Sequence, residues 1–191
     1  MPRIKNSSDA FTGLEAAIVL IAFVVVAAVF SYVILGAGFY TTQKSQETVY
    51  KSVEQATSNL QMLGQVYGIA SADPPTQIDK IQFNVGLAPG APALDLSKMI
   101  IVVSQPTVGN ITHLTYGTSP SATVFTVTDS SGATINNGVL NPLGQATIKF
   151  DLADPLMENG QATLELRPGV GAALPFTRTA PAQITASQIL V

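Results

Sequence analysis

The feature that most constrains this chain is a long run without charge near its N-terminus. No charged residue lies between Glu15 and Lys44, and the run reads AAIVLIAFVVVAAVFSYVILGAGF before it turns polar. About 20 consecutive apolar residues suffice to cross a bilayer as a helix, whereas buried strands run for about 4–8 residues. The length therefore predicts a helix despite the many β-branched residues. Because this stretch shows no polar face, it needs lipid or neighbouring protein on all sides.

The residues before this run form a short polar leader that differs from an ordinary secretory signal. The leader, residues 1–10, reads MPRIKNSSDA and ends on the small residue Ala10. A secretory signal has an apolar stretch of about 7–15 residues that is followed by a small-residue cleavage site. Here the small residue precedes the apolar run. Cleavage at that point would leave the whole hydrophobic helix on the mature protein.

The sequence AFTGLE at residues 10–15, followed by the apolar run and then by TTQKSQ, carries a family resemblance. It resembles the class III signal of type IV pilin-like proteins, and specifically the archaellins, the archaeal flagellins, over residues 9–46. The resemblance implies that a prepilin-type membrane peptidase cuts between Ala10 and Phe11, which makes Glu15 the fifth residue of the mature chain. It also implies a structural filament subunit, not an enzyme.

The resemblance further implies a cellular location and a set of partners. The precursor is expected to be inserted in the membrane until an ATPase-driven machine assembles it with copies of itself or of related subunits. The helices would then bundle in the core of an extracellular filament for swimming at the archaeal cell surface, with the other domains outside. A close alternative is an adhesive type IV-like pilin. An alternative of another class is a membrane-anchored surface protein that binds a ligand without forming a polymer.

Glu15 has a physical interpretation that does not depend on the family. A lone carboxylate at the start of a membrane helix is costly unless it lies at the interface or finds a partner. Cleavage before Phe11 would create an α-amino group one helical turn away, and pairing with a neighbour's amine would set an axial register. The helix dipole alone also favours a carboxylate at this end of a helix, so both interpretations stay open.

The helix is predicted to span residues 11–68, continuing beyond the membrane length as an amphipathic segment. Apolar residues recur there at steps of four and three, which is an a/d seam. The members of this seam are Val49, Val53, Ala56, Leu60, Leu63 and Tyr67. Gly64 and Gly68 are expected to end the helix and to lead into a linker over residues 69–77. We expect the seam to pack both on the chain's own C-terminal domain and on neighbouring subunits.

Residues 78–191 show a strand pattern. Short apolar or alternating runs, such as 81–85 and 146–150, are separated by turn sequences such as Asn159-Gly160. Seven or eight strands in about 110 residues predict an all-β sandwich domain of the immunoglobulin-like kind. The predicted fold class is therefore α+β, with a long N-terminal hydrophobic α-helix followed by a β-sandwich.

Motifs for chemistry are sparse, so no catalytic residue, cofactor or metal is predicted. The chain has no cysteine and a single histidine, His113, which leaves no thiolate site and no paired-histidine metal site. Asp151 and Asp154 are interpreted as a solvated turn in preference to a cation site. A net charge of −3 with only nine Lys and Arg argues against a nucleic-acid partner. Asn110 begins an N-x-T sequon on a predicted loop and is a candidate for glycosylation.

Overall fold

The structure, a computed structural model, describes residues 7–129, 131–135 and 137–191, with side chains from residue 13 onward. Residues 1–6 of the predicted leader lie outside the described residues. The chain divides into two compact units, Met1–Tyr50 and Lys51–Val191, which are described separately below.

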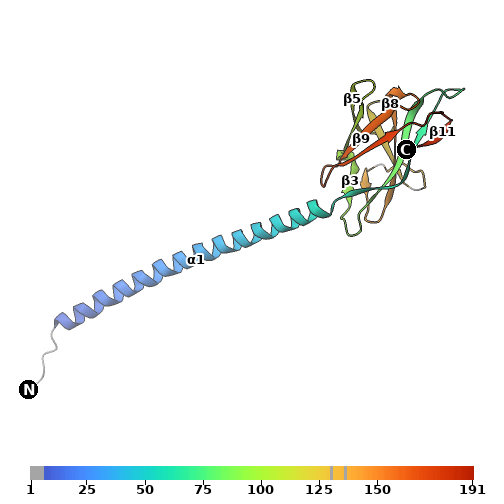
Figure 1. The fold of residues 1–191 in the computed structure, drawn as a ribbon. Helices are drawn as coiled ribbons and strands as arrows, with labels where there is room; N and C mark the ends of the chain where they lie inside the picture. The colour runs from blue at the N-terminus through green and yellow to red at the C-terminus, as the bar shows by residue number, and fades with distance from the viewer. Residues whose placement is uncertain (1–6, 130, 136) are drawn as a thin grey trace, which may run out of the picture. The chain divides into compact units, whose positions relative to one another are not determined.

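One continuous helix, α1 (Ser7–Thr57), makes up the N-terminal part of the chain (Figure 1). Its 51 residues correspond to a length of about 75 Å at 1.5 Å per residue. Every side chain from Gly13 to Gln46 is exposed in the single chain, and Gly13–Thr57 meets the length and composition of a membrane-crossing helix. The predicted long hydrophobic helix is confirmed, although it begins at Ser7, before the predicted Phe11.

The predicted continuation of the helix to residue 68 is wrong, because α1 ends at Thr57. Strand β1 (Leu60–Ile69) follows and pairs antiparallel with β2 (Ile78–Leu87). The β-domain therefore starts at β1, earlier than the predicted residue 78. The four–three spacing predicted a helix because the apolar residues at 60, 63 and 67 have the spacing of a helical seam, although they lie in a strand. The pairing of β1 with strands far along the chain cannot be predicted from the spacing of nearby residues.

The two glycines that predicted the end of the helix have other roles inside β1. Gly64 adopts a φ of +80° at a β-bulge, where the register with β2 shifts between Leu63 and Val66. Glycine reaches that left-handed conformation without steric cost, and a right-handed helix excludes it. A Cβ on Gly68 would lie 2.9 Å from Cγ2 of Ile78, so the absence of a side chain lets the two strands pack closely.

The β-domain is built from short strands and one 3-10 turn. Besides β1 and β2, the elements are β3 (Leu94–Asp95), η1 (Leu96–Lys98), β4 (Ile100–Gln105), β5 (Asn110–Tyr116), β6 (Val124–Asp129), β7 (Val139–Leu140), β8 (Gln145–Leu156), β9 (Gln161–Arg167), β10 (Leu174–Thr179) and β11 (Ser187–Leu190). Nine of these strands form one sheet in the order β10-β9-β4-β5-β6-β8-β2-β1-β11, and β3 pairs with β7. Only β5 and β6 pair in parallel among these neighbours.

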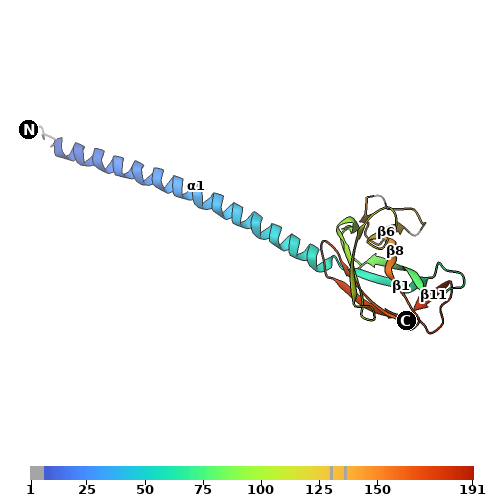
Figure 2. The same ribbon diagram turned by 90° about the horizontal axis from the view of Figure 1, so that it is seen from above.

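The nine-stranded sheet curls around a single apolar core. Phe83 of β2 and Phe176 of β10 stack edge to face with ring centroids 5.4 Å apart, so strands from distant parts of the sheet meet across the interior. Thr179 and Val191 exchange two backbone hydrogen bonds of 2.6 and 3.1 Å, which join the two ends of the sheet. Figure 2 shows β1 and β11 side by side at one of these ends. The predicted fold class, a long helix followed by an all-β domain, is confirmed.

Candidate assembly site

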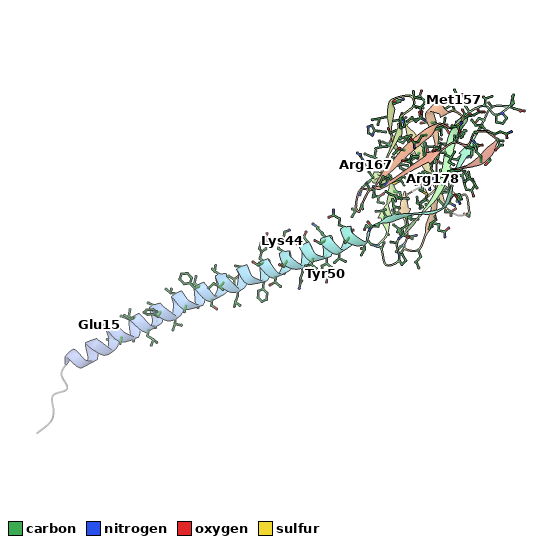
Figure 3. All side chains as sticks on the ribbon, viewed as in Figure 1. Glu15, Lys44, Tyr50, Met157, Arg167 and Arg178 are labelled. Atoms are coloured by element: carbon green, nitrogen blue, oxygen red, sulfur yellow. The ribbon has the colours of Figure 1, made fainter. Side chains whose placement is uncertain are left out.

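The surface of α1 is a long row of exposed apolar side chains. Each large apolar side chain from Leu14 to Tyr40 is more than half exposed, and Tyr32 reaches 81%. Figure 3 shows these side chains standing out along the helix between the labelled Glu15 and Lys44. Full burial of one such side chain is worth about 1.5–3 kcal/mol. The helix therefore requires an apolar environment all round, either lipid or other helices.

Two hydroxyl groups near the end of the charge-free run are satisfied by the helix itself. The Thr41 hydroxyl donates to the carbonyl of Ala37 at 2.8 Å, and the Thr42 hydroxyl donates to the carbonyl of Gly38 at 2.9 Å. A buried hydroxyl without a partner would be costly, and these two bonds remove that cost. These two threonines are therefore compatible with dry packing.

Glu15 is the charged residue at the start of this apolar surface. Its side chain is exposed, and it borders a shallow apolar depression that includes Val19 and Phe23. The backbone of α1 runs through Ala10 and Phe11, the residues of the predicted cut, but their side chains lie outside the described part. The predicted pairing of Glu15 involves a second subunit and stays a prediction.

The predicted seam is divided between two elements. Val49, Val53 and Ala56 lie on α1 and are exposed, Val49 at 60% and Val53 at 55%. The expected packing of these three residues on the chain's own domain and on neighbouring subunits stays a prediction. The other three belong to β1, where Leu60 is buried in the domain core, Leu63 is half-buried and Tyr67 is exposed. Only the helical members are available to a neighbouring subunit as a helix seam.

The glycosylation candidate Asn110 lies at the first position of β5, not in a loop as predicted. Its side-chain NH₂ donates to Oδ2 of Asp154 at 2.6 Å. Asp154 lies within β8 together with Asp151, so the predicted solvated turn at these two carboxylates is also wrong. The carbonyl of Asp154 accepts a further bond of 2.8 Å from the Gln105 side chain. These bonds fasten the β4–β5 hairpin to β8.

Within the residues that the structure describes, no three His, Cys, Asp or Glu side chains gather as metal ligands would. His113 is exposed on β5, opposite Val102 of β4. Asp151 instead faces Lys80 of β2, whose Nζ lies 3.9 Å from its Oδ1.

Two carboxylates have lowered pKa values because they organise turns. The Ser131 hydroxyl donates to Asp129 at 2.6 Å and the Ala133 N–H at 2.9 Å, and these bonds lower the pKa of Asp129. Hydrogen bonds from Ser97 in the same way lower the pKa of Asp95, which caps η1. Both carboxylates bond to their own turns, so the shifts reflect local geometry and not a catalytic centre.

Sequence reasoning missed the residues where α1 meets the sheet. Only Ser58 and Asn59 separate α1 from β1, and Ser58 is 2% exposed. The loop that covers them contains Gly171, whose φ is +106°. Its sequence, Pro-Gly-Val-Gly, predicts a turn but gives no sign of which segment packs against it.

Comparison with known proteins gives consistent results along the whole chain. The profile of the archaeal-type flagellin family matches residues 10–178. "Probable flagellin 1" of Archaeoglobus fulgidus is 36% identical over 200 residues, which cover 99% of this chain and 98% of that protein. A structure of the archaeal flagellum of Methanospirillum hungatei is 35% identical, with a TM-score of 0.75 over 94% of this chain and 99% of its own. Archaeal flagellin FlaB1 from Methanocaldococcus jannaschii, at 18% identity, shares the fold with a TM-score of 0.58 over 70% of this chain and 96% of its own.

Proposed function

The chain belongs to the archaeal-type flagellin family, and we propose how its parts build the filament. It is a structural subunit of the extracellular filament used for motility, and it assembles with other subunits. The family is structural, which agrees with the prediction of a non-enzyme. The adhesive pilin and the anchored binding protein are set aside, because the match to a flagellin extends over 98% of that protein.

The apolar surface of α1 forms the core of the filament. The observation that carries this proposal is that every side chain from Gly13 to Gln46 is exposed in the single chain. Before assembly the same surface faces lipid, and the precursor is held in the membrane. Transfer from lipid to a helix bundle gains little hydrophobic free energy, because both environments are dry. An ATPase machine therefore supplies the work of extraction, and packing between helices supplies the stability.

A prepilin-type peptidase prepares the subunit by cutting between Ala10 and Phe11. The cut removes Arg3 and Lys5 and exposes a new α-amino group at the start of the apolar helix. Glu15 of one subunit then pairs with the new amine of a neighbour. A carboxylate enclosed by apolar helices would be unstable alone, so this pair fixes the axial position of each subunit.

The exposed helical part of the seam extends the core beyond the membrane-length segment. Val49, Val53 and Ala56 follow one another at i, i+4 and i+7, which places them on one side of α1. All three side chains are exposed, and neighbouring helices cover them in the filament.

Asn110 is the site of a glycan that is added before the domain folds. Its amide nitrogen, the atom that a glycan would occupy, donates to Asp154 in the folded domain. This hydrogen bond must be broken before an enzyme can modify the nitrogen. Modification of the unfolded chain therefore fits this position better than modification of the assembled filament.

The first test is the intact mass and N-terminal sequence of filaments sheared from cells. An N-terminus at Phe11 in sedimented material supports the cut, and extra mass that disappears in Asn110→Gln supports the glycan. Filaments whose subunits begin at Met1 would overturn the proposed cut. Unmodified Asn110 would overturn the glycan and leave the filament role untouched.

A further inference from the structure

The connection between α1 and the sheet is unusually short and closely packed. All of its residues belong to the compact unit Lys51–Val191. The Ser58 N–H donates to the carbonyl of Glu54 at 2.9 Å, which continues the helical bonding pattern one residue past Thr57. β1 then begins at Leu60. A flexible linker needs several residues without fixed partners, and this connection has no room for one.

Gly171 makes the closest approach to this connection. A Cβ on Gly171 would lie 1.7 Å from the carbonyl oxygen of Ser58 and 2.8 Å from its carbonyl carbon, the tightest approach at any described glycine. The obstructing atoms are backbone, so no rotation of a side chain relieves the clash. The φ of +106° at Gly171 adds a second requirement for glycine.

Asn59 ties the same connection to two different loops. Its Oδ1 accepts from the N–H of Ala172 at 3.3 Å, and its backbone carbonyl accepts from the N–H of Ala88 at 3.1 Å. Its side-chain NH₂ donates back to the carbonyl of Ala56, inside the last turn of α1, at 3.2 Å. One residue therefore links the end of the helix to the β2–β3 loop and to the β9–β10 loop.

We propose that Ser58, Asn59, Ala88, Gly171 and Ala172 form a stiff joint through which the core helix holds the outer domain. Gly171 is the positioning residue that makes this joint possible. The proposal rests on the role of the chain as a filament subunit. In a filament that transmits motion, neighbouring outer domains must keep constant positions on the core. A two-residue connection fixed on both sides holds each domain, whereas a loose one would let domains adopt many positions and weaken their packing.

The test compares Gly171→Ala with a matched control in the full chain, expressed in cells that assemble it. Gly132→Ala is the control, because Gly132 also has a positive φ, +85°, but a Cβ there would meet nothing within 4 Å. We expect Gly132→Ala to assemble normally. We expect Gly171→Ala to lower the yield of sedimentable filaments by about tenfold or more, the factor that corresponds to a loss of 1.4 kcal/mol. Normal filaments from Gly171→Ala would overturn the proposal.

A second variant separates stiffness from folding. Insertion of Gly-Gly-Ser between Thr57 and Ser58 keeps the bonds from Ala88 and Ala172 to Asn59. It separates Ser58 and Asn59 from the last turn of α1, to which they donate at Glu54 and Ala56. We expect the inserted chain to retain the thermal unfolding midpoint of the β-domain and to fail in filament assembly. Assembly of this chain at normal yield would refute the stiff joint. A further readout is Asn59→Asp, which keeps an acceptor for the Ala172 N–H and is expected to assemble better than Asn59→Ala.

These experiments also distinguish the joint from the function itself. If the unaltered chain and Gly132→Ala both fail to form filaments, the filament role is wrong. If both assemble while the inserted chain also assembles, only the joint is wrong.

Discussion

Val49 gives the sharpest test of whether the exposed seam on α1 is an interface between subunits. Its side chain is 60% exposed in the single chain. Full burial of a valine is worth about 1.5–3 kcal/mol, so covering the exposed part contributes about 1–2 kcal/mol per subunit. Val49→Ser removes this contribution. Serine and valine have similar helix propensities, so the helix itself is expected to change by less than about 0.5 kcal/mol.

The expected result is weaker filaments built from normally folded subunits. A loss of about 1–2 kcal/mol per subunit corresponds to about 5–30-fold more free subunit at equilibrium. The assay measures the fraction of sheared filament that still sediments as guanidinium concentration rises, with helix content followed in parallel. Gln46→Ser, at an exposed polar position on the same helix, is the control. If Val49→Ser and Gln46→Ser filaments dissociate at the same guanidinium concentration, the seam is not buried between subunits.

Three further changes test other parts of the molecule. Glu15→Ala is expected to reduce filament yield and to leave the thermal unfolding of the β-domain unchanged; normal yield would exclude the proposed pair. Phe83→Ala removes a ring that is 1% exposed and stacks on Phe176, so we expect a loss of about 3–5 kcal/mol in the free energy of unfolding, measured by denaturant titration of the detergent-solubilised chain. Hydrogen bonds led by that of Ser131 lower the pKa of Asp129 in the folded state, so its stabilisation is present above an ordinary aspartate pKa of about 3.9 and is lost as the pH falls through the lower folded value. Asp129→Asn should therefore show a smaller fall in melting temperature on acidification than the unaltered chain, and an equal fall would contradict this assignment.

Two glycines show the limits of predicting secondary structure from local sequence in this chain. Gly64 and Gly68 were expected to end the helix, but α1 already ends at Thr57, and the structure uses both glycines within β1 for a bulge and a close packing contact. The prediction of a helical seam was also wrong after Thr57. Leu60, Leu63 and Tyr67 have helical spacing, yet β1 gains more from pairing with β2 and β11 than a further helical extension would gain alone. Strand pairing is a non-local interaction, and a local pattern cannot report it.

The candidate sites also divide into those that local sequence can predict and those that depend on contacts between distant residues. Asn110 and Asp154 each looked like residues of an exposed loop or turn, and their contact joins positions 44 residues apart. The joint was missed for a similar reason, since Gly171 and Ser58 approach each other only after the β9–β10 loop has folded back over the end of α1. By contrast, Glu15 could be singled out directly, because a single charge beside a charge-free run is a property of the sequence itself.

What the sequence alone determined is the long apolar helix and the need to bury it among partners. That result depends on the composition of residues 16–43. The backbone hydrogen bonds of a helix form within the segment itself, and exposing its apolar side chains to water is unfavourable. What only the tertiary structure decided is where the helix stops, which strands lie side by side and which residues fasten the helix to the sheet. Those outcomes depend on contacts between segments that are distant in the sequence. Such contacts stabilise the domain only once folding has brought the segments together around the core.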